Sequence, residues 1–137
     1  MEDFVTFEIA KKLKEKGFKE QCLAYYTKDS DFYYNNSYGS DVENAFKSFN
    51  SRPNHICGKR IDAPIIYQVL KWLREEKLIL IGLSPMQEYD VEETIEWCAT
   101  VYKADKQGGL SLKEELYYES YEQAALASIE YVLDNLI

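Results

Sequence analysis

The chain has 137 residues, a length that suits one domain with a hydrophobic core of its own. Hydrophobic residues make up 46% of it, which argues against disorder as a description of the whole chain. The N-terminal stretch lacks the apolar segment of a signal peptide, and no apolar run approaches the ~18 residues of a membrane span. We therefore expect a cytoplasmic protein that does not contact a membrane.

The net charge of −8 is unevenly distributed along the chain. Residues 1–83 carry 13 Lys/Arg and 12 Asp/Glu, whereas residues 84–137 carry 3 Lys/Arg and 12 Asp/Glu, a net charge of −9. Binding to a phosphate backbone depends on Lys and Arg, so this acidic third is unsuited to it. Two interpretations stay open for it: a solvated acidic surface, or a surface that binds a partner.

The cysteine and histidine content predicts neither a metal site nor a cofactor. Cys22, Cys57 and Cys98 are scattered and lack metal-ligand spacing, which indicates buried reduced thiols. The single histidine, His55, lies near Cys57 in a predicted loop. Their separation alone gives no nucleophile-base geometry and no third orienting group, so we predict no catalytic role for the pair.

Residues 3–16 are predicted to form a first helix with a narrow apolar face and lysines around the rest. Gly17 is expected to end this helix in the left-handed conformation, with Phe18 folding back towards Leu13.

Residues 19–40 are unusually aromatic. Residues 23–26 and 32–34 are predicted to be short strands joined by a polar turn over residues 27–31. Two readings of the tyrosines stay open: a partner-binding surface, or rings that cover the sheet. The five are Tyr25, Tyr26, Tyr33, Tyr34 and Tyr38. A short helix over residues 41–49 follows, with Ser40 and Glu43 as its capping box.

The central helix and the strand after it have the clearest pattern. Asp62 is predicted as the N-cap and Pro64 as a first-turn residue. Apolar residues recur at helical spacing from Ile66 to Leu73, with Trp72 at the edge of the stripe. The apolar run 78–83 then predicts a strand that is largely covered on both faces.

The last third is predicted to contain two more strands and a closing helix. Residues 84–93 are expected to form a loop or a distorted hairpin connection whose clustered carboxylates lack the spacing of a calcium site. Residues 94–103 alternate as a half-buried antiparallel strand, residues 104–109 form a turn, and residues 110–118 form a third strand. Ser120, with Gln123 three residues later, caps the final helix.

These elements predict an α+β single domain over residues 1–137. Residues 1–60 supply a helix, the aromatic segment and a short helix; residues 61–137 supply a helix, a three-stranded antiparallel sheet and a closing helix. The expected core comprises Phe7, Leu13, Ile66, Val69, Leu70, Leu73, Ile79, Ile81, Trp97, Val101, Ile129, Val132 and Leu136.

The stretches APIIYQVLKWLREEKLILI, FEIAKKLKEKGFKEQCLAYY and the terminal SYEQAALASIEYVLDNLI, together with the predicted hairpin that contains Trp97, resemble a group of short, uncharacterised proteins of gut bacteria and their phages. The resemblance covers both ends and the centre of the chain and leaves out residues 27–60. It implies a phage or mobile-element origin, and it implies no activity and no functional residue.

The sequence contains no nucleotide-binding, nucleophile-elbow or metalloprotease motif, so we do not expect an enzyme. The first hypothesis is a non-enzymatic module that binds another protein through the aromatic segment or the acidic third. The acidic surface, which includes Glu114, Glu115 and Glu119, could also imitate a nucleic-acid backbone.

The alternative is a nucleic-acid-binding domain, because helix-and-hairpin order and helix, three strands, helix order occur in winged helices and double-stranded-RNA domains. Such binding needs a basic surface, and the residues available for it are Lys71, Arg74 and Lys77, with Lys59 and Arg60. Nucleic acid is therefore the less favoured partner, and the oligomeric state stays open.

Overall fold

The computed structural model describes residues 3–35, 60–87 and 95–137. These residues form two compact units, 3–65 and 66–137, each with a three-stranded antiparallel sheet. Helices and small antiparallel sheets confirm the predicted α+β class. Several predictions lie outside the described residues: the helix at 41–49 with its Ser40 cap, Tyr38, Lys59, the His55 and Cys57 loop, and the acidic stretch 88–93.

The first unit begins with an extended segment rather than a helix. Helix α1 spans Phe7–Glu15, and the prediction that it starts at residue 3 is wrong. Thr6 caps it, because its hydroxyl oxygen accepts the Ile9 N–H at 3.3 Å. The preceding residues pair with another part of the chain: Phe4 bridges Ile65 in antiparallel fashion.

The end of α1 has the predicted geometry. Gly17 has a φ of +90°, a conformation that costs glycine little. The Phe18 N–H donates to the Leu13 carbonyl at 3.0 Å, and the Phe18 side chain is buried. This arrangement satisfies one of the carbonyls left without a partner at a helix end.

The aromatic segment forms the predicted strands β1 (Ala24–Tyr26) and β2 (Phe32–Tyr34), which pair antiparallel. Strand β3 (Ile61–Ala63) pairs with the other edge of β1, giving the order β2-β1-β3. The sequence did not predict β3.

The predicted start of the central helix is therefore wrong. Asp62 lies within β3, and helix α3 spans Ile66–Glu76, so Pro64 precedes the helix. The reason is local: Ala63 directly precedes Pro64, and the proline ring disfavours the helical conformation at the residue before it. The extended backbone then pairs with β1.

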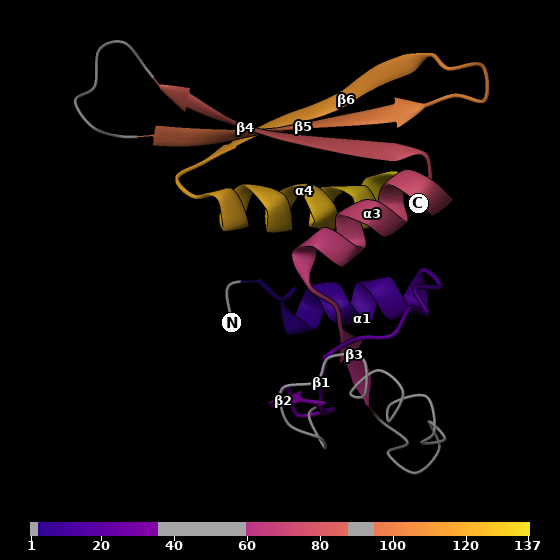
Figure 1. The fold of residues 1–137 in the computed structure, drawn as a ribbon, viewed down its shortest axis with the longest axis vertical. Helices are drawn as coiled ribbons and strands as arrows, with labels where there is room; N and C mark the ends of the chain where they lie inside the picture. Colours follow the sequence, from indigo (N-terminus) through magenta and orange to yellow (C-terminus); the bar gives the residue numbers. More distant parts are fainter. Residues whose placement is uncertain (1–2, 36–59, 88–94) are drawn as a thin grey trace. The chain divides into compact units, whose positions relative to one another are not determined.

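The second unit contains α3, a sheet and a closing helix. Strands β4 (Ile79–Gln87), β5 (Ile95–Ala104) and β6 (Leu110–Tyr118) pair antiparallel in that order, and α4 spans Tyr121–Asn135. Figure 1 shows α3 and α4 on the same side of this sheet. The predicted order of helix, three strands and helix is confirmed.

Strand β4 is longer than predicted. The residues 84–87, expected to lie in a loop, continue the pairing with β5 as far as Gln87 opposite Ile95. Pro85 lacks an N–H, and β4 tolerates it because β4 is an edge strand of the sheet. The run 78–83, predicted to be largely covered on both faces, is less covered than expected, since Gly82 is exposed and Leu80, Ile81 and Leu83 are half-buried.

Most of the predicted core residues are buried in the two units, and the others are only half-buried. Leu13 and Ile66 are buried as expected, and so are Val69, Leu73, Ile79, Val101, Ile129 and Val132. Five predicted core residues are only half-buried: Phe7, Leu70, Ile81, Trp97 and Leu136. The core also includes Trp72, which was predicted at the edge of its helical stripe, and Val5, Ile9 and Tyr26.

The start of α4 offers a direct test of the predicted cap. The Ser120 hydroxyl oxygen accepts the Gln123 N–H at 3.1 Å. Replacing Ser120 by Ala leaves that N–H without its partner, and we expect the free energy of unfolding to fall by about 1 kcal/mol. Urea unfolding measures the change; Ser120→Asn, which keeps an acceptor oxygen, should retain most of the stability. Equal losses in both variants would contradict the capping role.

Candidate functional site: the open face of the second sheet

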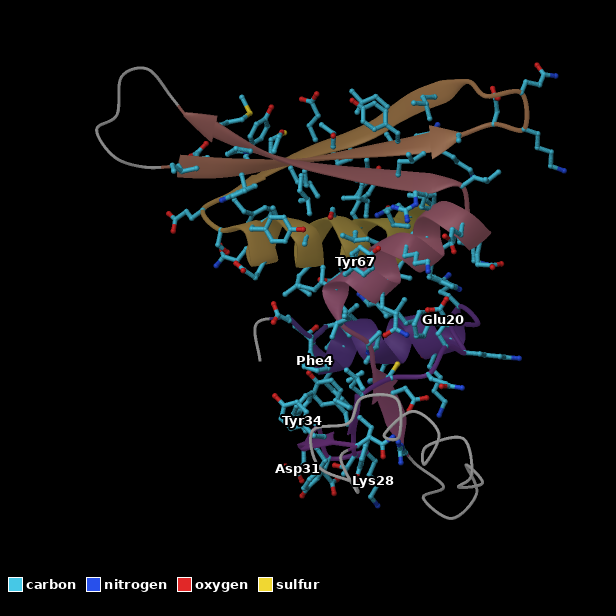
Figure 2. The ribbon with its side chains drawn as sticks, in the orientation of Figure 1. Phe4, Glu20, Lys28, Asp31, Tyr34 and Tyr67 are labelled. Atoms are coloured by element: carbon cyan, nitrogen blue, oxygen red, sulfur yellow. The ribbon has the colours of Figure 1, made fainter. Side chains whose placement is uncertain are left out.

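The sheet β4-β5-β6 has two faces of different character. One faces α3 and α4: Ala99 and Val101 of β5 are fully buried there, and Trp97 makes an edge-on ring contact with Tyr121 of α4 at 5.2 Å. On the other face, which we call the open face, no helix of the described residues 66–137 packs. Figure 2 shows side chains projecting from it, away from the two helices.

Cross-strand pairing determines which residues share the open face, because directly opposite residues point to the same side. Leu80 pairs with Tyr102, and Tyr102 pairs with Leu112, so these three form a row across all three strands. Ala104 pairs with Leu110 in the next row. We call these five residues the apolar end of the open face.

The apolar end is accessible. Leu110 is 59% exposed and Leu112 is 51% exposed, values typical of polar strand positions rather than of leucine. Leu80, Tyr102 and Ala104 beside them are half-buried. A contiguous apolar patch on a small sheet is a feature of interaction surfaces, whereas isolated exposed leucines are common and need no explanation.

The charged strand positions of the open face are both acidic. They are Glu96, which pairs with Met86, and Glu115, which pairs with Thr100. Of the lysines of β5 and β6, Lys103 alternates to the covered face opposite Ile79, whereas Lys113 lies at the bulge, where the pairing assigns it to neither face.

Glu115 is held in a local network at the surface. Its Oε2 accepts the Tyr117 hydroxyl at 3.3 Å, and its backbone N–H donates to Glu114 Oε1 at 3.0 Å. The Glu115 carboxylate raises the pKa of the exposed Tyr117 hydroxyl, chiefly by charge repulsion with the tyrosinate. Tyr117 therefore stays a neutral hydrogen-bond donor at neutral pH.

In the middle of the open face, the side chains on β4 and β5 are small. Gly82 pairs with Thr100 there, and a Cβ added to Gly82 would lie 2.8 Å from Thr100 Oγ1. Thr100 Oγ1 itself donates to the Gly82 carbonyl at 3.4 Å. The glycine leaves room for this threonine and allows another backbone to approach closely.

The tyrosines predicted as a candidate surface are divided between the two faces of the first sheet. Tyr25 is half-buried, and its ring stacks on the ring of exposed Tyr33 at 5.7 Å. Tyr26 is buried and belongs to the core. Tyr34 is exposed, and its ring lies edge-on to the Phe4 ring with the ring centres 5.8 Å apart (Figure 2).

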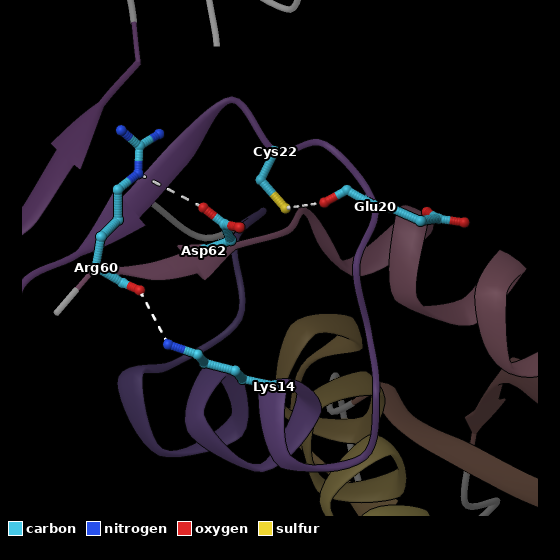
Figure 3. Close-up of polar contacts among 5 residues, drawn as sticks. All are labelled: Lys14, Glu20, Cys22, Arg60 and Asp62. Atoms are coloured by element: carbon cyan, nitrogen blue, oxygen red, sulfur yellow. Dashed lines mark hydrogen bonds and ion pairs between the residues drawn. The ribbon is translucent and has the colours of Figure 1, made fainter. Parts of the chain in front are cut away.

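The first sheet also carries a polar cluster, shown in Figure 3. The Arg60 guanidinium lies 4.0 Å from the centre of the Tyr25 ring, and its Nε is 3.6 Å from Asp62 Oδ1. Burial raises the pKa of the Asp62 carboxyl, and the charges of Arg60 and Lys14 oppose that rise. The cluster links strand β3 to α1, because Lys14 Nζ donates to the Arg60 carbonyl at 3.4 Å.

Cys22 lies beside this cluster and is an inert thiol. Burial raises the pKa of its thiol, and the nearby carboxylates of Asp62 and Glu20 raise it further. The thiol donates to the Glu20 carbonyl at 3.4 Å. Cys22 and Cys98 are both buried and unbridged, which confirms the prediction for these two residues.

The predicted acidic candidates do not form one surface. Glu115 lies on the open face, whereas Glu114 pairs with Val101, whose side chain points to the covered face. Glu119 is exposed in the connection between β6 and α4. The basic residues of the alternative hypothesis are likewise divided: Lys71, Arg74 and Lys77 belong to the second unit and Arg60 to the first.

The sequence did not identify the apolar end as a site. The alternation of residues 94–103 placed Tyr102 on the same side of the strand as Glu96, Cys98 and Thr100, and this was the first signal in the sequence for the apolar end. Leu110 and Leu112 repeat with period two and form the second signal, but a period-two pattern is equally typical of residues that face a core.

Within the described residues, no group of His, Cys, Asp and Glu side chains is arranged to hold a metal ion. None of the helices in this part of the chain combines the length and apolar character that a bilayer crossing requires. Comparisons with protein-family models, with curated proteins and with solved structures find no match for this chain.

Proposed function

We propose that this chain is a non-enzymatic protein-binding module, of phage or mobile-element origin, whose partner docks on the open face of the sheet β4-β5-β6. The observation that carries the proposal is the contrast between the two faces. Helices α3 and α4 cover one face, and the other face presents exposed Leu110 and Leu112 next to Leu80 and Tyr102. A partner that covered these side chains would remove apolar surface from water, at about 25 cal/mol per Å².

The open face is a better candidate than the tyrosine segment. The rings of the first sheet largely contact one another: Phe32 packs edge-on against Tyr26 at 5.3 Å and against Tyr34 at 5.1 Å. Ring contacts of this kind stabilise a local core. Leu110 and Leu112, by contrast, are more than half exposed and fit a binding role more closely.

A tagged pull-down from host lysate with three matched baits tests the proposal. The wild-type chain should capture a discrete protein that survives nuclease treatment. Leu110→Thr/Leu112→Thr should reduce recovery at least about tenfold, since threonine keeps the strand propensity and removes apolar area. Tyr67→Ser, which removes an exposed ring from α3, should leave recovery unchanged.

Two results would overturn the assignment. Loss of the partner from a Tyr33→Ser/Tyr34→Ser bait, with full recovery on Leu110→Thr/Leu112→Thr, would move the site to the first sheet. Recovery that depends on nucleic acid would favour the nucleic-acid-binding alternative. Thermal unfolding of each bait is the control that checks whether the substituted chains still fold.

A further inference from the structure

We infer that the occupant of the open face is a cationic amphipathic helix of another protein, an inference that rests on the proposed function and specifies its partner. Three features of the sheet support it: the sign of the charges on the face, the features that prevent an added strand from pairing with either edge, and the small side chains in the middle of the face.

The charges select a basic partner. Glu96 and Glu115 are the charged residues that cross-strand pairing places on the same face as the apolar end. A ligand with Lys or Arg beside its apolar side chains would meet these carboxylates, whereas an acidic ligand or a phosphate backbone would be repelled. A second copy of this chain is disfavoured for the same reason, because two open faces would place carboxylates against carboxylates.

The edges of the sheet indicate that the partner lies on the face and does not add a strand. Strand β4 carries Pro85, which offers no N–H to an incoming strand. The other edge, β6, is interrupted by the bulge at Lys113 and carries Glu114 and Glu115 next to it. Bulges, prolines and charges are the features by which proteins prevent edge pairing.

The shape of the face suits a helix. Helices α3 and α4 already lie on the other side of the same sheet, and an amphipathic helix buries its apolar stripe by packing it against another element such as a sheet face. The row of Gly82, Thr100 and Glu115, whose side chains are small on β4 and β5, separates the apolar end from Met86 and Tyr117. A helix lying along the strands can contact both apolar regions and approach closest to the sheet at the glycine.

The test uses the full chain and two synthetic probes. One is a peptide of about 14 residues with leucines at helical spacing and lysines elsewhere; the other has glutamate in place of every lysine. Fluorescence anisotropy should show binding of the lysine peptide, at least about tenfold weaker binding of the glutamate peptide, and a loss of affinity between about 50 and about 500 mM salt.

Variants of the chain test whether the lysine peptide binds on the open face. Leu110→Thr/Leu112→Thr should weaken the lysine peptide at least about tenfold, and Glu96→Gln/Glu115→Gln about three- to tenfold. Glu75→Gln/Glu76→Gln, on exposed positions of α3, makes the same change in net charge away from the face and should have less than about a twofold effect. Equal effects of the two glutamine pairs would show a net-charge effect and overturn the inference.

The remaining outcomes separate the two proposals. Equal affinity for the two peptides, or no binding of the lysine peptide, would overturn the cationic-helix inference, and the pull-down with the Leu110→Thr/Leu112→Thr bait would still decide the proposed function. A concentration-dependent dimer by light scattering that this double variant abolishes would also overturn the inference, since the occupant would then be a second copy.

Discussion

Ile79→Ala is expected to lower the free energy of unfolding by about 2–5 kcal/mol. Ile79 is fully buried at the start of β4, on the face that α3 and α4 cover. Truncation removes buried methyl groups and leaves a cavity that the surrounding helices and strands can only partly close. Because a domain of this size is stable by about 5–15 kcal/mol, this is a large fraction of its stability. Urea denaturation followed by circular dichroism measures the change.

Leu112→Ala is the matched control for Ile79→Ala. It removes the same number of carbon atoms from the same sheet, on the open face where Leu112 is half exposed. We expect the free energy of unfolding to change by no more than about 0.5 kcal/mol, as is usual for surface substitutions. A loss at Leu112 as large as that at Ile79 would show that the open face is covered within the protein, and would contradict its role as a docking surface.

Tyr26→Phe is expected to destabilise the protein by about 1–3 kcal/mol. The Tyr26 hydroxyl donates to the Val5 carbonyl at 2.7 Å, and both residues are buried. Phenylalanine fills the same space for the ring but leaves the carbonyl without that donor, and an unsatisfied buried acceptor costs more than a hydrogen bond contributes. The Val5 N–H is held in turn by the Pro64 carbonyl at 3.1 Å, so the loss weakens the extended N-terminal segment.

The same side chain makes the stability depend on alkaline pH. Burial raises the pKa of the Tyr26 hydroxyl above its usual value of about 10, so the folded state favours the neutral form. Its contribution to stability is complete below pH ~10 and is lost as the pH rises from there through the folded-state pKa. Tyr26→Phe should reduce this dependence in urea titrations, and Tyr33→Phe, at an exposed position, should leave the stability at neutral pH unchanged.

Local chemistry was sufficient to predict several elements from the sequence. The left-handed glycine at position 17 and the Ser120 cap are each specified by neighbouring residues, and the structure confirms them. The predicted strand at residues 110–118 is also confirmed, and it is held by pairing with β5. The strand at residues 61–63 was missed because its extended conformation comes from pairing with β1, which is distant in sequence. The proline at position 64 was the local signal in the sequence that the helix starts after this residue and not at Asp62.

The sequence by itself determined the α+β class, the order of helix, three strands and helix in residues 66–137, and the acidity of the last third, because periodicity and charge are local properties of the chain. Only the tertiary structure decided which face of the sheet the helices cover. Strand alternation assigns residues to two faces but does not say which one is sealed. The register that brings Leu80, Tyr102 and Leu112 into one exposed row depends on pairing between strands, and the candidate site exists only in that pairing.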